Sequence, residues 1–271
     1  MSAEHEFMQG VDNLAIRTAG LAWLKLTRDA HIHERCFYLT DCVRRLGRRE
    51  LRIFDVGCGS GLALYYLDSC VRGAVSNYLG IDMLSPDRLR SRYGNISIPH
   101  EFGQAYLDDD WNYGEFDLVW CAEVIEHLLD DRRLVKKLRS HLSPDGLLIV
   151  TTPSKVFVEK TGRFVPGYDA VSSTQDGGHV RTGYDLDMLR ELGHCSGLAL
   201  QSHAWLMPGN ASDVRWHLNP HPSPIGTVAR NVRDRFVRRC ADFVLNGDPG
   251  LYADRYMTIS ATFAPRKNNG A

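Results

Sequence analysis

Four side chains that can bind protons or metal ions fall into two short stretches of the sequence. Glu123, Glu126 and His127 are spaced i, i+3 and i+4, so the start of a helix would place all three on one face. His179 follows in a later polar segment that could bring it to the same place. Imidazoles titrate near neutral pH, which makes His127 and His179 candidate general bases for a hydroxyl proton. The same four side chains would also suit a divalent ion such as Mg²⁺ or Mn²⁺.

A glycine-rich turn forms a second candidate site. The apolar stretch Leu51 to Val56 has the length of a strand, and it stops at the segment Gly57 to Gly61, after which a helical pattern begins at once. Glycines suit such a turn because the backbone bends sharply and a ligand must approach it closely. A further strand, Asn77 to Ile81, ends in Asp82, about 20 residues on, where an acid can bind ribose hydroxyls. The pattern predicts a nucleoside-binding strand–helix–strand unit.

Asp55 separates the two ligand classes that fit this unit. A dinucleotide would place its pyrophosphate over the glycine turn, where backbone N–H groups and the helix N-terminus attract negative charge. Asp55 directly precedes the glycines and would repel that charge, whereas it suits a ligand that carries an ammonium and a sulfonium. The turn reads G-C-G-S-G and does not complete the dinucleotide spacing G-x-G-x-x-G. NAD binding is therefore the least favoured interpretation.

The segment Asp55 to Gly61 resembles the glycine motif of class I S-adenosylmethionine-dependent methyltransferases. Residues 116–119, 123–128 and 142–147 also match the family's pattern, and the resemblance covers roughly residues 53–200. It implies S-adenosylmethionine as cofactor and S-adenosylhomocysteine as product. The cofactor-binding residues that it implies are Asp55, Gly57, Cys58, Gly59, Gly61, Asp82, Met83, Gln104, Ala105, Cys121 and Ala122. Gln104 stands where the family commonly has an acid facing adenine, and its amide oxygen can still accept one hydrogen bond.

The resemblance leaves three roles open for the glutamate and histidine group. In many family members this segment only shapes the cofactor pocket, with Glu126 satisfying backbone N–H groups and His127 packed below. General base catalysis by His127 or His179 is the second role. The third is a divalent metal held by Glu123, Glu126, His127 and His179, which resembles small-RNA 3′-end 2′-O-methyltransferases and some ubiquinone-pathway O-methyltransferases. The metal role is not favoured, because metal-free relatives share the pattern around His179.

The order of the expected elements predicts an α/β fold: a doubly wound, mostly parallel, seven-stranded Rossmann-like sheet. Such a sheet places ligands at the carboxyl ends of its strands. The expected strands are Leu51 to Val56, Asn77 to Ile81, Ile96 to Phe102, Glu115 to Ala122, Leu147 to Thr152, Leu198 to Leu206 and Tyr256 to Phe263.

Three regions divide the chain. Residues 1–48 are expected as an N-terminal helical cap, residues 49–206 and 254–265 as the methyltransferase core, and residues 207–253 as a substrate-cap insertion. The insertion includes a predicted helix from Thr227 to Leu245, whose arginines either face solvent or hold an anionic group of the acceptor. Four aromatic residues are either core or walls of an acceptor pocket: Trp205, Trp216, Tyr168 and Tyr184.

Composition narrows the class of protein. The 271 residues are 44% hydrophobic and 24% charged, as in ordinary globular proteins, and the net charge of −1 argues against an obligatory nucleic-acid partner. The seven cysteines are scattered without a C-x-x-C pair, which indicates reduced thiols. The sequence shows neither a signal pattern nor an apolar run of membrane-spanning length, so we expect a cytoplasmic protein with no membrane partner. A homodimer stays open.

These observations predict an enzyme that transfers methyl from S-adenosylmethionine to a small-molecule acceptor. The favoured reaction is O-methylation of a bulky metabolite in biosynthesis, because His127 and His179 are candidate bases and a large insertion faces the pocket. A divalent-metal-dependent RNA 3′-end 2′-O-methyltransferase is the first alternative. A non-catalytic methyltransferase-like binding subunit is the second.

Overall fold

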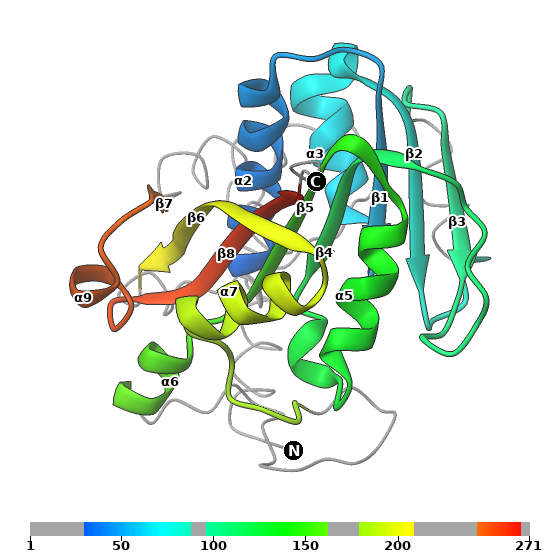
Figure 1. Cartoon of the computed structure of the whole chain (residues 1–271). Coiled ribbons are helices and arrows are strands. Elements are labelled where there is room, and N and C mark those ends of the chain that lie inside the picture. Colours follow the sequence, from blue (N-terminus) through cyan, green and yellow to red (C-terminus); the bar gives the residue numbers. More distant parts are fainter. Residues whose placement is uncertain (1–29, 88–95, 162–178, 209–242, 267–271) are drawn as a thin grey trace, which may run out of the picture.

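The strands of the computed structural model form one eight-stranded sheet in the order β3-β2-β1-β4-β5-β8-β6-β7 (Figure 1). The structure describes residues 30–87, 96–161, 179–208 and 243–266. The strands are β1 (Leu51–Val56), β2 (Val75–Asp82), β3 (His100–Gln104), β4 (Phe116–Ala122), β5 (Leu142–Pro153), β6 (Leu198–Pro208), β7 (Phe243–Leu245) and β8 (Tyr256–Pro265).

The first five strands pair in parallel, and the remaining pairs are antiparallel. Parallel strands need crossovers and are covered on both faces, which explains the nearly continuous apolar sequence of β4. Their shared direction brings the carboxyl ends of β1 to β5 to one edge of the sheet. The glycine turn, Asp82, Gln104 and the segment after β4 therefore meet at that edge.

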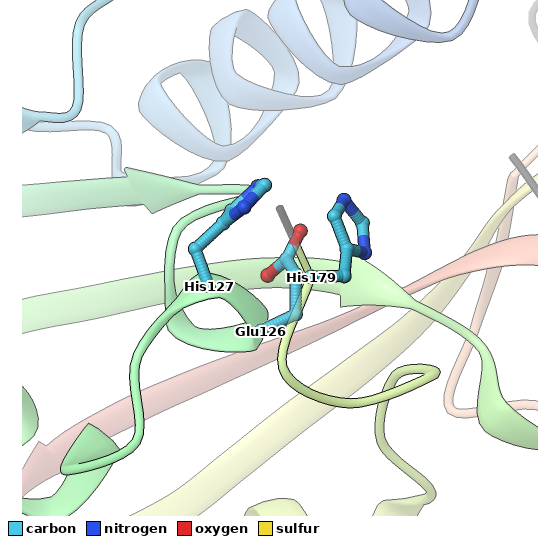
Figure 2. Close-up of side chains that lie close together, drawn as sticks. All are labelled: Glu126, His127 and His179. Carbon is cyan, nitrogen blue, oxygen red and sulfur yellow. The ribbon is translucent and has the colours of Figure 1, made fainter. Parts of the chain in front are cut away.

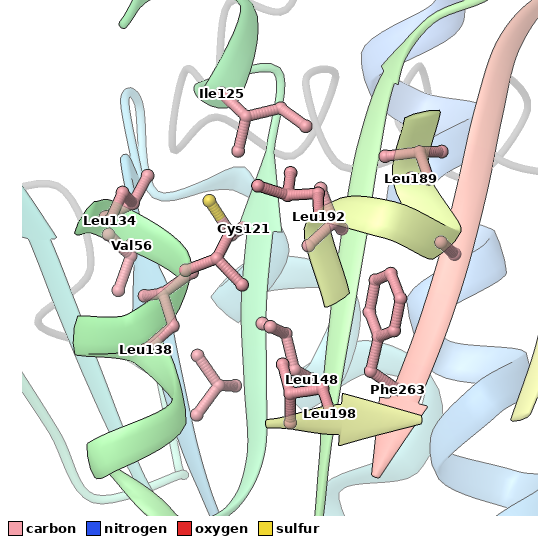
Figure 3. Close-up of a cluster of buried hydrophobic side chains, with 14 of the residues drawn as sticks. Val56, Cys121, Ile125, Leu134, Leu138, Leu148, Leu189, Leu192, Leu198 and Phe263 are labelled. Atoms are coloured by element: carbon pink, nitrogen blue, oxygen red, sulfur yellow. The ribbon is translucent and has the colours of Figure 1, made fainter. Parts of the chain in front are cut away.

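Helices cover both faces of the sheet. On one face lie α2 (Ala30–Leu46) and α3 (Leu62–Val71), and on the other lie α5 (Asp131–Ser140) and α7 (Leu186–Cys195). Figure 3 shows part of the second cluster, which includes Leu138 of α5, Leu189 of α7 and Phe263 of β8. Burying each side chain of this size stabilises the fold by about 1.5–3 kcal/mol. The shorter helical segments are η2 (Arg72–Ala74), η3 (Ile125–His127), α6 (Lys155–Thr161) and α9 (Pro249–Tyr252).

The predicted doubly wound, mostly parallel sheet is confirmed, but it has one strand more than expected. The additional strand is β7, and the predicted helix through Leu245 is wrong over these last residues. Leu245, Val244 and Phe243 pair with Ala204, Trp205 and Leu206 of β6. Hydrogen bonds to a distant strand override the local helical pattern at this point. Residues 209–242, including the rest of that predicted helix, lie outside the described residues.

The third strand begins at His100, four residues later than predicted. The cause is the buried carboxylate of Asp68 in α3, whose Oδ1 accepts hydrogen bonds from the backbone N of Ser97 (3.0 Å) and of Ile98 (3.2 Å). These two residues therefore bend around Asp68. Nothing in the sequence around Asp68 indicated that its side chain would bind residues 97 and 98 and so delay the start of β3.

The predicted end of the N-terminal helix is confirmed at Gly47. This glycine has φ of +62°, and its backbone N donates to the carbonyl oxygen of Arg44 at 3.1 Å, which closes the last turn of α2. Residues 12–29 of the predicted helix lie outside the described part. No helix within residues 30–87, 96–161, 179–208 and 243–266 combines the length and the apolar character needed to cross a bilayer.

Candidate functional site

The glycine turn has a backbone that only glycine adopts easily. Gly57, Gly59 and Gly61 have φ of +74°, +50° and +70°. A Cβ on Gly57 would also overlap Cγ2 of Val124. The backbone N atoms of Gly57 and Cys58 donate to the carbonyl oxygen of Ile81 at 2.8 and 3.0 Å. The turn is thus packed between the ends of β2 and β4, with Gly59 left open to a ligand.

Asp82 ties the end of β2 to this turn. Its Oδ2 accepts from the backbone N of Gly59 at 2.8 Å, and its Oδ1 accepts from the backbone N of Leu84 at 3.0 Å. The carboxylate is half-buried beside the turn. This is the place that the sequence predicts for ribose recognition.

Asp55 is buried at the end of β1, with 2% of its surface exposed. The pKa of its carboxyl is raised to about 7, chiefly by burial. The hydroxyl of Tyr78, which donates to Oδ2, opposes this shift, and the nearby charge of Asp82 contributes to it. Near neutral pH the carboxyl is poised between its charged and neutral forms. A cation at this edge would stabilise the charged form.

The expected adenine side lies at the end of β3. Gln104 donates through Nε2 to the carbonyl oxygen of Met83 (2.8 Å) and to the hydroxyl of Tyr106 (3.1 Å). These two contacts orient the amide so that its oxygen is the group offered to a ligand. Tyr106, with 51% of its surface exposed, is a site residue that the sequence analysis missed. Its signal was an aromatic two residues after Gln104. Ala105 is buried, and its backbone N donates to the carbonyl oxygen of Asp82 at 3.0 Å.

Three further residues were predicted to bind the cofactor, and their side chains are buried or half-buried: Cys58, Cys121 and Ala122. Burial raises the pKa of the Cys58 and Cys121 thiols, so both remain neutral. The side chain of Cys121 points into the core under α5, which leaves only its backbone for ligand contact. Ala122 is half-buried where β4 ends beside Thr151 of β5.

Glu123 does not join the other acid and the two histidines. Its φ is +55°, in the left-handed region, so no helix begins here and the predicted common helical face is wrong. Oε2 of Glu123 forms an ion pair with Nη1 of Arg35 at 3.1 Å, and Oε1 accepts from Oγ1 of Thr151 at 3.2 Å. Arg35 comes from α2 and is 7% exposed. The sequence gave no local signal for this pair, because its members lie in distant elements.

Glu126, His127 and His179 do come together. Their potential ligand atoms all lie within 4.8 Å of one another, and the two imidazole centroids are 4.2 Å apart. Figure 2 shows the carboxylate of Glu126 between the two rings. Glu126 and His127 belong to the single turn η3 after β4, whereas His179 comes from the segment before α7. We refer to these three residues as the Glu–His cluster.

The Glu–His cluster has one fully buried member, Glu126, and two partly exposed members, His127 and His179. Glu126 is fully buried; its Oε2 accepts from Oγ1 of Thr152 at 3.2 Å, and its Oε1 has no hydrogen-bond partner among the described residues. Burial raises the pKa of this carboxyl well above its usual range, and the charge of Glu123 adds to the effect. Burial lowers the pKa of His179 to about 4, with His127 contributing. At neutral pH, His179 is therefore an uncharged imidazole that can take up a proton or a metal ion.

Of the four aromatic residues that the sequence offered as pocket walls, the two that the structure describes are buried. Trp205 is a core residue, 1% exposed, whose Nε1 donates to the carbonyl oxygen of Gly247 at 3.0 Å. Tyr184 is also buried, and its hydroxyl contacts Arg181 and Asp131. Trp216, Tyr168 and the arginines of residues 230–239 lie outside the described residues.

A cavity of about 480 Å³ lies at the opposite edge of the sheet. It is lined by the end of α2, the turn at residues 47–49 and the segment 70–74, which precede β1 and β2. Arg44 and Arg72 stand at the carboxyl ends of α2 and α3, where cations offset the helix dipole. This cavity is separate from the Glu–His cluster and from the glycine turn.

Comparisons with known proteins agree with this geometry. A family model described as a methyltransferase domain matches residues 29–208, more than half of the chain. The ubiquinone biosynthesis O-methyltransferase of Colwellia psychrerythraea is 30% identical over 113 residues, which cover 40% of this chain and 44% of that protein. The chain thus matches less than half the length of this curated relative.

Two solved structures share the fold at low sequence identity. An S-adenosylmethionine-dependent methyltransferase from Clostridium acetobutylicum aligns with a TM-score of 0.53 and 10% identity, over 86% of this chain and 92% of that one. The [4+2]-cyclase SpnF aligns with a TM-score of 0.52 and 17% identity, over 85% and 81%. Likeness at this level shows the fold alone. The family model carries the assignment: this chain belongs to the methyltransferase domain family, in its class I S-adenosylmethionine-dependent group.

Proposed function

We propose that this protein transfers the methyl group of S-adenosylmethionine to a hydroxyl of a small-molecule acceptor. The observation that carries the proposal is that the glycine turn and the Glu–His cluster share the carboxyl edge of one parallel sheet. In the proposed arrangement the cofactor lies over Gly57 to Gly61, its ribose faces Asp82, and its adenine faces Gln104. Its ammonium is near Asp55, and the reacting methyl faces the cluster.

The reaction would be a direct displacement. The acceptor oxygen forms a bond to the methyl carbon while the carbon–sulfur bond breaks, and its electron pair returns to sulfur as S-adenosylhomocysteine forms. The hydroxyl proton passes to a base, for which the neutral imidazole of His179 is suited. His127, beside it, is the other candidate. The protein's main contribution is alignment of the two reacting groups, which can lower the barrier by about 7–11 kcal/mol.

The acceptor class is supported by the relatives. The Colwellia psychrerythraea protein and several further relatives are named ubiquinone biosynthesis O-methyltransferases, a name that places the reaction at oxygen. Carrying this class over to the present chain gives the proposal its acceptor, a small molecule with an ionisable hydroxyl. The fold alone would not decide this, since a [4+2]-cyclase shares it.

A divalent metal at the Glu–His cluster is a second candidate. The donors fit: one buried carboxylate oxygen of Glu126 lacks a hydrogen-bond partner among the described residues, and two imidazoles lie beside it. Two nitrogens and one oxygen suit Mn²⁺, Fe²⁺ or Zn²⁺ better than Mg²⁺. Glu123 would not be a ligand, because Arg35 and Thr151 occupy its carboxylate. A bound ion would acidify the acceptor hydroxyl, and the RNA 3′-end alternative depends on it.

Calorimetric titration tests the proposed cofactor. Wild-type protein should bind S-adenosylhomocysteine with a Kd on the order of micromolar, about −8 kcal/mol. Asp82→Ala should weaken binding at least about tenfold, because the variant loses both the ribose contact and the support of Gly59. Asp145→Ala removes an exposed carboxylate at the opposite edge and serves as the matched control. Absence of binding by the wild type would overturn the proposal.

Transfer itself is tested by single turnover with phenolic acceptors, following S-adenosylhomocysteine formation. Product with any acceptor excludes the non-catalytic alternative, and cofactor binding without product would favour it. Titration of metal-free protein with Mn²⁺ and Zn²⁺ separates the two roles of the cluster. Binding that is lost in His179→Ala but kept in His194→Ala, a histidine at the end of α7, supports the metal. If the wild type binds neither ion, the metal role is excluded, and the general-base role and the role of shaping the cofactor pocket remain.

A further inference from the structure

The two halves of the Glu–His cluster come from segments that lie far apart in the sequence. His127 follows β4, whereas His179 precedes α7. Among the described residues, one backbone hydrogen bond joins them directly: the N of Val180 donates to the carbonyl oxygen of Glu126 at 2.9 Å. A single bond of this kind would leave the second segment free to pivot, so another contact must fix where His179 lies.

Arg181 supplies that contact. Its Nη2 donates to the carbonyl oxygens of Leu128 (2.9 Å) and Leu129 (3.3 Å), which directly follow η3. Its Nη1 pairs with Oδ2 of Asp131 and donates to the hydroxyl of Tyr184 at 2.6 Å. One planar guanidinium therefore binds the backbone that follows η3 and, at the same time, the side chains of Asp131 and Tyr184.

Tyr184 anchors the other end of the same segment. Its hydroxyl donates to Oδ2 of Asp131 at 2.6 Å. Its backbone N donates to the carbonyl oxygen of Pro153 at 3.0 Å, and its own carbonyl oxygen accepts from the N of Lys155 at 3.1 Å. The segment 179–184 is thus fixed to the end of β5 by Tyr184 and to the segment 125–131 by Arg181.

We infer that Arg181 is a positioning residue whose guanidinium holds His179 against His127. The side chain of Arg181 is 26% exposed and that of Asp131 is 13% exposed, so water screens their attraction only in part. Lysine could keep the charge opposite Asp131, but it lacks the planar fork that reaches two carbonyls and a hydroxyl together. The inference rests on the proposed function only in taking the two histidines as the reactive centre.

Histidine-selective NMR tests this geometry without any acceptor. Imidazole centroids 4.2 Å apart should give a cross-peak between the ring protons of His127 and His179, assigned with His127→Gln and His179→Gln. Arg181→Met should abolish this cross-peak and lower kcat about tenfold or more, while the Kd for S-adenosylhomocysteine stays within about threefold. Arg181→Lys should give intermediate values. Arg190→Met breaks an exposed ion pair with Asp187 on α7. This control should change neither the cross-peak nor kcat, and it should leave the Kd as it is.

The outcomes are separable. A cross-peak retained in folded Arg181→Met, or missing from the wild type, overturns the inference. If Arg181→Met does not fold, Tyr184→Phe and Asp131→Asn remove single contacts of the same guanidinium, and each should weaken the cross-peak. Unchanged cross-peaks in both would likewise overturn it. Should the wild type methylate no acceptor, the proposed function fails, but the cross-peak still decides the role of Arg181.

Discussion

At the scale of single residues, the candidate site is defined by two buried carboxyls. Asp55 and Glu126 are both buried at the carboxyl edge, and burial raises the pKa of each. A buried carboxylate is costly unless a cation or hydrogen-bond donors compensate it. Two buried carboxyls at the carboxyl edge therefore disfavour folding, and a cationic ligand bound there would offset the cost.

This argument predicts a pH dependence for Asp55. Its folded pKa of about 7 lies above the ordinary value of 3.8, so the folded chain holds a proton that the unfolded chain releases between these values. Its contribution to the free energy of unfolding should therefore fall as pH rises through this window and level off above about pH 7. Because a cation favours the ionised form, cofactor affinity should rise over the same range.

Urea denaturation and calorimetry between about pH 5 and pH 8 measure both effects. Asp55→Asn should reduce the fall in stability by the part that this carboxyl contributes and should remove the rise in affinity, whereas Asp145→Asn, at the opposite edge, should keep both. Identical pH profiles for wild type and Asp55→Asn would show that this carboxyl does not titrate in the window.

At the scale of elements, close packing of a helix on the sheet can require a residue that helix propensity disfavours. Gly193 lies inside α7, where propensity favours alanine by about 1 kcal/mol. It is nevertheless buried against the ring of Phe263 in β8, and a Cβ at this position would overlap that ring. The helix can approach the sheet this closely because position 193 has no side chain.

Gly193→Ala should consequently destabilise the protein, by about 1–3 kcal/mol, since overpacking outweighs the gain in propensity. The midpoint of chemical denaturation reports this change. Phe263→Leu makes room at the same contact, so the double variant should be more stable than the sum of the two single changes predicts. A stabilised Gly193→Ala would mean that the helix moves away from β8 at little cost.

At the scale of the whole molecule, the proposed cofactor site joins the ends of several strands. The glycine turn follows β1, Asp82 ends β2, Gln104 ends β3, and Glu126 and His127 of the Glu–His cluster follow β4. A ligand that touches all of them binds only the folded chain and stabilises it by mass action.

S-adenosylhomocysteine at 100 times its Kd should raise the free energy of unfolding by about 2.7 kcal/mol. For a domain of this size that corresponds to an increase in Tm of about 5–10 °C, measurable by differential scanning calorimetry. Asp82→Ala, with binding weakened at least about tenfold, should gain at most about 1.4 kcal/mol at the same concentration, about half of the wild-type increase. NADH should give no increase with the wild type. An equal shift with NADH would contradict the assignment of Asp55 as a selector against dinucleotides.

The sequence by itself determined the parts whose signal is local. Strand β1, the glycine turn and Asp82 at the end of β2 were predictable, because a short apolar run, a need for positive φ and a fixed spacing all lie within one continuous segment. The fold class followed, since alternating strands and helices have few alternatives to a doubly wound sheet. His127 and His179 were predictable as candidates from their chemistry.

Only the tertiary structure decided which of these side chains meet. Glu123 was predicted to share a face with Glu126, but a left-handed backbone turn and an ion pair with Arg35 of α2 separate the two. The late start of β3 and the strand at Phe243 depend in the same way on distant partners, Asp68 and β6. Hydrophobic periodicity indicates the secondary structure that one segment favours. A buried ion pair or hydrogen bond between two elements depends on both of them, so neither segment alone predicts it. The folded chain alone brings those two elements together.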